Sequence, residues 1–361
     1  MTSEDGTPPE IAGARVAHSA LDEPATPARL RALATAGVLD ERAFVAALAA
    51  IGARPDGASW RRWVDRLLLV LGALLVVAGV VFYIAANWGA VSPHARMVLV
   101  AALISGSAGL AARLGLDAMS GRACTLVGGL LVGPLLALYG QTYQTGADAW
   151  ELFAGWAGLI LGFCTVARFP GLWLFWVALI DTTVCLYWDQ ELGRRVDLEQ
   201  GLPLALALVA IQVTALAVWE VGRASGAVWM AGRAFARAVA TAGIVAIVLP
   251  VLVFIVEPRG QTTPMLLMAT TIVVAAAALA GLLLVYREWI PDLFMLALDG
   301  AAAATIAGVL VGRLIFLDLR LELGGVFLLG IVILGEMWAL AHWLRTWRSH
   351  PAHATAPEIE A

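Results

Sequence analysis

The chain has 361 residues, of which 61% are hydrophobic and only 14% are charged. An average soluble domain carries about 25% charged residues, and this chain has too few charges to cover a water-exposed surface. The net charge of -4 and the lack of a basic cluster exclude nucleic acid as a partner, because phosphate binding needs grouped cations. We therefore expect an integral membrane protein whose main partner is the lipid bilayer.

A polar head precedes the first apolar run. Residues 1–27 are rich in Pro, Ala, Thr and acids and are predicted to be disordered. Over residues 28–62, apolar positions recur at helical spacing around Gly37, with Asp40 as a helix N-cap, which predicts a helical hairpin on the cytoplasmic face. A DNA-binding helix-turn-helix is the alternative, but residues 1–56 contain five Arg against eight Asp and Glu, which disfavours it.

Ten apolar stretches follow within a transmembrane domain predicted over residues 63–345. The first, residues 67–86, has no charge and crosses a hydrocarbon layer of about 30 Å at about 1.5 Å per residue. The other nine are residues 97–112, 123–139, 152–167, 172–188, 202–219, 238–256, 265–286, 293–312 and 324–344. The predicted fold class is therefore all-α, a polytopic bundle of about ten membrane helices with a disordered tail over residues 346–361.

Arginine in the short connections predicts the orientation. If the head is cytoplasmic, that side of the membrane collects about twice as many arginines as the other side, as the positive-inside rule requires. We therefore expect both termini in the cytoplasm.

Glycine pairs at four-residue spacing predict places where membrane helices approach closely. Three such pairs are Gly129 and Gly133, Gly158 and Gly162, and Gly308 and Gly312.

Three acids lie deepest within the predicted spans: Asp181, Asp299 and Glu336. An ionisable group in the membrane is costly and is a candidate for function, here an ion or proton path. Asp299 and Glu336 lie at similar predicted depths on consecutive spans, so their carboxyl groups are expected to share a proton. The alternative is that each is a neutral acid that donates to a backbone carbonyl.

A second set of polar residues follows the ends of the first and third spans, on the predicted outer face. These residues are Asn87, Arg96, Gln141, Tyr143, Gln144 and Asp148. Amide, hydroxyl and carboxyl groups that converge there suit a small polar ligand or a partner loop. The alternative is that they cap helices and form turns, which Asn, Gly and Asp ordinarily do.

The two segments that contain these residues also resemble a known protein family. The stretch Phe82-Tyr-Ile-Ala-Ala-Asn-Trp88 with Arg96, then Gly140-Gln-Thr-Tyr-Gln144 with Asp148 and Trp156, resembles the bacterial membrane protein family catalogued as domain of unknown function 2157. The resemblance covers about residues 30–190. It implies a bacterial cytoplasmic (inner) membrane protein, and it implies no reaction, ligand or catalytic residue.

Enzyme motifs are absent from the sequence. It has no HExxH, G-x-S-x-G or Walker sequence, and Asp181 and Asp299 lack the glycine-flanked motif of membrane aspartyl proteases. The cysteines Cys124, Cys164 and Cys185 lie in apolar stretches without metal-ligand spacing, so we expect no metal and no cofactor.

The sequence leaves two functions open. The first is a non-catalytic membrane component that assembles with other envelope proteins or with itself. The alternative is a proton- or cation-coupled transporter or channel-like protein that uses the intramembrane acids.

Overall fold

The computed structural model describes residues 27–51, 57–87, 89–192, 198–256, 265–321 and 323–348. The chain divides into two compact units, with the boundary between Val64 and Asp65. The disorder predicted for residues 1–26 and 349–361 lies outside the described residues. Residues 346–348, predicted as the start of the disordered tail, are instead the end of a helix that spans Leu323–Arg348.

The first unit contains a helical hairpin, α2 (Pro27–Thr35) and α3 (Glu41–Ala50), as predicted. Gly37 has a φ of +73°, which a glycine adopts without the strain that a side chain would cause. The Asp40 carboxylate accepts a hydrogen bond of 2.6 Å from the Ala43 N–H and caps α3. The local signals of a glycine turn and an N-cap therefore fix this hairpin.

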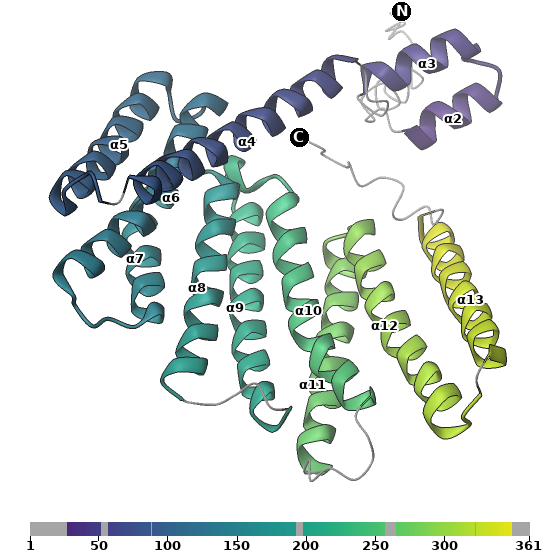
Figure 1. Cartoon of the computed structure of the whole chain (residues 1–361). Coiled ribbons are helices and arrows are strands. Elements are labelled where there is room, and N and C mark those ends of the chain that lie inside the picture. The colour runs from purple at the N-terminus through teal and green to yellow at the C-terminus, as the bar shows by residue number, and fades with distance from the viewer. Residues whose placement is uncertain are drawn as a thin grey trace, which may run out of the picture. The chain divides into compact units, whose positions relative to one another are not determined.

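Within the described residues, ten helices are long and apolar enough to cross a membrane, and there is no strand. They are α4 (Gly57–Ala86), α5 (Pro93–Leu114), α6 (Met119–Tyr143), α7 (Ala149–Ala167), α8 (Pro170–Gln190), α9 (Leu198–Ala224), α10 (Ala234–Val256), α11 (Met265–Leu284), α12 (Leu293–Arg313) and α13 (Leu323–Arg348). Two of them continue into π-helical turns, α11 into η2 (Val285–Trp289) and α12 into η3 (Leu314–Asp318). Each helix coincides with one predicted span, so the all-α fold class and the count of ten are confirmed (Figure 1).

The outer sides of the helices are apolar. Phe82, Phe327 and Trp338 are at least 70% exposed, although each is a large hydrophobic side chain. Such exposure is unfavourable in water and is expected where acyl chains solvate the surface.

Helix α6 lies between α5 and α7, and its glycines explain how closely α7 approaches. The indole Nε1 of Trp156 donates a hydrogen bond of 2.8 Å to the Gly129 carbonyl, and the Trp156 ring occupies the space beside Gly133. The close contact predicted for this pair is therefore confirmed. A Cβ at Gly158 or at Gly162 would meet nothing within 4 Å, so the contact predicted for that pair is wrong among the described residues.

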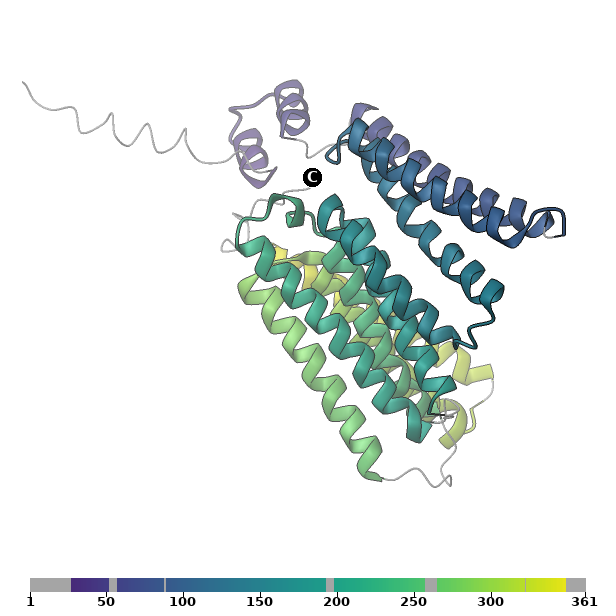
Figure 2. The ribbon, with the colours of Figure 1, turned by 90° about the vertical axis from the view of Figure 1, so that its left-hand side faces the viewer.

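Helix α10 is the centre of the C-terminal half. It packs against α8, α9, α11 and α12, and α13 packs on α12. Its residues Ala236, Val239 and Ile247 are almost completely buried, because helices surround it. Figure 1 and Figure 2 show this group of helices side by side, from teal to yellow. The candidate site lies between α10 and three of its neighbours.

Candidate functional site

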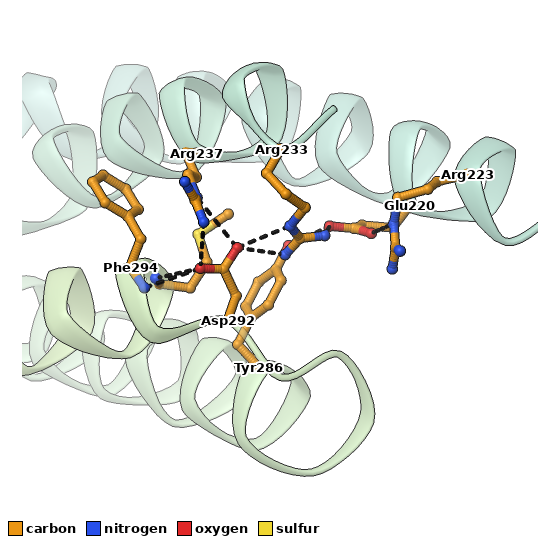
Figure 3. A network of polar contacts seen from close by, with 8 residues as sticks. Glu220, Arg223, Arg233, Arg237, Tyr286, Asp292 and Phe294 are labelled. Carbon is orange, nitrogen blue, oxygen red and sulfur yellow. Dashed lines mark hydrogen bonds and ion pairs between the residues drawn. The ribbon is translucent and has the colours of Figure 1, made fainter. Parts of the chain in front are cut away.

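A buried carboxylate, Asp292, ties the start of α12 to the start of α10. As the N-cap of α12 it accepts from the backbone N–H of Phe294 at 2.9 Å and of Met295 at 3.4 Å. The Nε of Arg233 donates to its Oδ2 at 2.8 Å, and Nη2 of Arg237 donates to its Oδ1 at 3.3 Å. Arg237 Nε also donates to Oδ2, at 3.3 Å. The Asp292 side chain is only 2% exposed, so these five N–H donors replace its water (Figure 3).

The same arginine, Arg233, bridges to a second acid on α9. Its Nη1 donates to Oε1 of Glu220 at 2.8 Å, and the Tyr286 hydroxyl donates to the same oxygen at 3.0 Å. Oε2 of Glu220 accepts from Nε of Arg223 at 2.8 Å. Figure 3 shows the five charged groups in one row that joins α9, α10 and α12.

The partners decide the charge state of this row. Burial raises the pKa of Asp292, but the hydrogen bonds and charges of Arg233 and Arg237 outweigh burial and hold that pKa below its usual range. Burial lowers the pKa of Arg233, while Glu220 and Asp292 raise it, with a net increase. Three guanidinium groups thus face two carboxylates, and one positive charge is not neutralised within the row.

Tyr286, whose hydroxyl binds Glu220, belongs to a cluster of aromatic side chains that includes Trp219, Trp229 and Phe235. Trp219 stacks on Phe235 with ring centres 3.9 Å apart, and Trp229 meets Trp219 edge-on at 5.4 Å. The Arg233 guanidinium lies 5.5 Å from the centre of the Tyr286 ring. These rings exclude water from the ion pairs, which strengthens them.

A cavity of about 420 Å³ begins beside Glu220 and Tyr286 and continues between α9, α10 and α11. Its walls are almost entirely aliphatic, for example Leu216, Ile247 and Leu282. Val213, which also lines it, is 57% exposed, so the cavity is open at the side of the helix bundle. A volume of this size is typical of small-ligand sites.

The deep end of the cavity is polar. Gln212 lines it and donates a hydrogen bond of 2.6 Å through Nε2 to Oδ2 of Asp181 on α8. This places one of the three predicted acids next to the cavity.

The other two predicted acids do not meet. Asp299 is buried, and its Oδ1 has no hydrogen-bond partner among the described residues. The Oε2 of Glu336 lies beside Gly308, which is about two and a half helical turns, or about 13 Å, further along α12 than Asp299. The shared proton predicted for the two acids is therefore wrong. The reason is register, since the Leu340 side chain packs beside Gly300, at the level where Glu336 was expected.

The predicted outer-face residues mostly serve helix ends. The Asn87 amide donates to the Tyr83 carbonyl at 2.9 Å, and the backbone N–H of Asp148 donates to Glu151 at 3.1 Å at the start of α7. Gln144 ends α6 in the left-handed conformation, with a φ of 47°. These contacts fit the capping alternative.

The other three predicted outer-face residues lie in different environments. Tyr143 contacts His94, at the start of α5, with ring centres 6.3 Å apart. Arg96 is buried in α5, whereas Gln141 is exposed. The contact that these residues make between α5 and α6 is thus the aromatic one between His94 and Tyr143.

Sequence reasoning missed most of the residues in the ion-pair row. Asp292 follows Pro291 and directly precedes an apolar run, which is an N-cap pattern, and Glu220 lies beside the arginine-rich end of a span. Arg233 and Asp292 are 59 residues apart in the chain, so no local pattern predicts their pairing. Within the described residues, no cluster of His, Cys, Asp and Glu is placed to hold a metal ion.

Comparison with known proteins identifies one family. Residues 31–173 match the model of a family described as "Predicted membrane protein (DUF2157)", which confirms the resemblance over this part of the chain. No curated protein and no solved structure matches the chain. The matched residues end within α8, so the ion-pair row and the α9–α11 cavity lie outside them. The chain is thus a multi-pass membrane protein for which the comparisons give no activity.

Proposed function

We propose that this chain is a non-catalytic membrane protein that binds an anionic membrane lipid in the cavity between α9, α10 and α11. The observation that supports the proposal is the order of side chains along two helix faces that border the cavity. The cavity lining includes Gln212, Leu216 and Glu220 on α9 and Ile247, Gly243 and Ala240 on α10. The next residues on the same faces are Arg223 and Arg237, which lie just beyond the lining, at what we call the arginine end of the cavity. Because each step is three or four residues, each set shares one helix face and leads from a mostly apolar interior to an arginine.

The acyl chain alone gives little selectivity. A lipid chain is already surrounded by hydrocarbon in the bilayer, so its transfer into an aliphatic cavity gains mainly packing contacts. Selectivity for one lipid over another must therefore come from contacts with the head group.

The arginine end of the cavity favours an anionic head group. Arg223 bonds to Glu220 through Nε, its side chain is 32% exposed, and its two terminal nitrogens have no partner among the described residues. The Arg237 side chain is 33% exposed. Together with the one unneutralised positive charge of the row, these groups attract phosphate, with about 1 kcal/mol per arginine near the surface.

Lipid retention measured by native mass spectrometry tests the proposal. The purified, delipidated protein is mixed in detergent with phosphatidylglycerol or with phosphatidylcholine of the same acyl chains. We expect preferential retention of phosphatidylglycerol, and Arg223→Gln should weaken it about fivefold, which corresponds to about 1 kcal/mol. Ala278→Phe, which fills the cavity, should reduce retention of both lipids.

Arg113→Gln is the matched control. Arg113 is an exposed arginine in the last turn of α5, on the same side of the membrane by helix alternation, and it is far in sequence from the cavity. Equal retention of the two lipids, or equal effects of Arg113→Gln and Arg223→Gln, would overturn the proposal.

The two functions predicted from the sequence remain predictions. Assembly with other membrane proteins would use an apolar face such as that of α13, on which Phe327, Ile331 and Trp338 are exposed. Transport coupled to protons or cations would use the deep acid Asp181. Placement in the bacterial inner membrane with cytoplasmic termini also remains a prediction, and it would put the arginine end of the cavity in the cytoplasmic leaflet.

A further inference from the structure

The contact between Asp181 and Gln212 leaves two oxygen atoms without partners. The one hydrogen bond between them runs from Gln212 Nε2 to Asp181 Oδ2 at 2.6 Å. The remaining oxygens, Asp181 Oδ1 and Gln212 Oε1, are both buried, and neither has a hydrogen-bond partner among the described residues. Both atoms are acceptors unless a proton is added, and unpaired buried acceptors are costly.

One proton on Asp181 gives both of these oxygens a role in a hydrogen bond. A carboxylic acid has an O–H donor as well as acceptor oxygens, and a carboxamide carries one acceptor and two donors. The acid O–H then donates to Gln212 Oε1 while Gln212 Nε2 donates to the acid carbonyl, so the two groups form a closed pair with two hydrogen bonds. We infer that Asp181 holds a proton inside the membrane as a neutral acid paired with the Gln212 carboxamide.

Within the described residues, no cation forms an ion pair or a hydrogen bond with Asp181 that could replace this proton. The groups that interact with Asp181 within the described residues are Gln212, which is neutral, and Cys185 one turn along α8. From α10, the residue that faces Gln212 is Gly243, which has no side chain. A carboxylate there would lack the arginines that Asp292 has, so the neutral form is favoured.

The inference defines a proton-binding site at the deep end of the cavity, and it does not depend on the lipid proposal. The site suits a protein whose ligand binding or conformation responds to protons from within the membrane. Gln212 would transmit the change, because it lines the cavity and its Oε1 loses the O–H donor when the proton leaves.

Infrared difference spectroscopy in reconstituted membranes tests the inference, because a protonated carboxyl group has a carbonyl band that a carboxylate lacks. At pH 7 we expect Asp181→Asn to lose one such band that is present in the unmodified protein. Asn can form the same closed pair as an amide, so this variant should keep the fold. Gln212→Leu should keep the band but move it to higher frequency, because the carbonyl loses its donor.

Asp148→Asn is the matched control, since Asp148 is an exposed acid at the start of α7, and this change should leave the band intact. Protonated-carboxyl bands that are the same in Asp181→Asn and in the unmodified protein would show that Asp181 is ionised and would overturn the inference. A Gln212→Leu band at an unchanged frequency would overturn the pairing.

Discussion

Substitution of Asp292 by Asn tests whether the ion-pair row stabilises the C-terminal half. The amide keeps the size of the side chain and its capping of α12, but it cannot pair with two guanidinium groups. Loss of one partner from a buried pair costs about 3–5 kcal/mol. Arg237 is one-third exposed and Arg233 keeps Glu220, so we expect the lower end, about 3 kcal/mol. Asp292→Ala also removes the cap and should cost about 1 kcal/mol more.

Unfolding by sodium dodecyl sulfate in mixed micelles, followed by circular dichroism, measures these differences. The matched control is Glu288→Gln, which also turns an acid into an amide next to an arginine. Glu288 lies 3.2 Å from Arg287, but the two side chains are 56% and 48% exposed, so the change should cost less than about 1 kcal/mol.

A double-mutant cycle isolates the pair itself. We expect Asp292→Asn and Arg233→Gln to show a coupling energy of about 2 kcal/mol, because the two side chains touch. A coupling energy near zero, or equal costs of Asp292→Asn and Glu288→Gln, would refute the reasoning that burial makes this row stabilising.

Two further predictions concern the effect of acidic pH on stability and the packing of α6 against α7. The arginines lower the pKa of Asp292 in the folded state from its ordinary value of 3.8. The ionised Asp292 therefore stabilises the folded protein fully above pH 3.8, and this contribution is lost as the pH falls below 3.8 toward the lower folded-state pKa. The stability difference between the unmodified protein and Asp292→Asn should therefore stay constant from about pH 7 to about pH 5 and shrink below about pH 4; a constant difference down to about pH 2 would contradict this. Gly133→Ala should cost about 1–3 kcal/mol in the same unfolding assay, because the new methyl group meets the Trp156 ring. Gly158→Ala, which meets nothing within 4 Å, should cost nothing measurable, and equal costs would contradict the α6–α7 packing.

The membrane helices were predictable because the signal for each one is local. A span must satisfy its backbone hydrogen bonds within itself, so an apolar run of sufficient length identifies it without knowledge of its neighbours. The head hairpin was predictable for the same reason, because Gly37 and Asp40 act on the residues next to them. These features need no tertiary contact.

The contacts between helices were less predictable, because depth in the membrane does not fix register or rotation. Asp299 and Glu336 lie on neighbouring helices, yet packing of Leu340 beside Gly300 sets them about two and a half turns apart. The pair Gly158 and Gly162 has the same spacing as Gly129 and Gly133, but nothing lies within 4 Å of the position that a Cβ would take at either residue. A small-residue motif is the same in sequence whether or not a partner helix fills the space beside it.

The chemistry of a buried acid depends on which side chains reach it, and this explains why the sequence located Asp181 but did not reveal its role. Asp292 and Asp181 are the same residue type, and α10 packs against the helices that carry both. Two arginines reach Asp292, so it stays ionised and joins helices near the membrane surface. Within the described residues, the hydrogen bond to Asp181 comes from the Gln212 amide, so a proton takes the place that the arginines have at Asp292. Under the two proposals, one cavity has a charged end that selects a lipid head group and a neutral end that holds a proton.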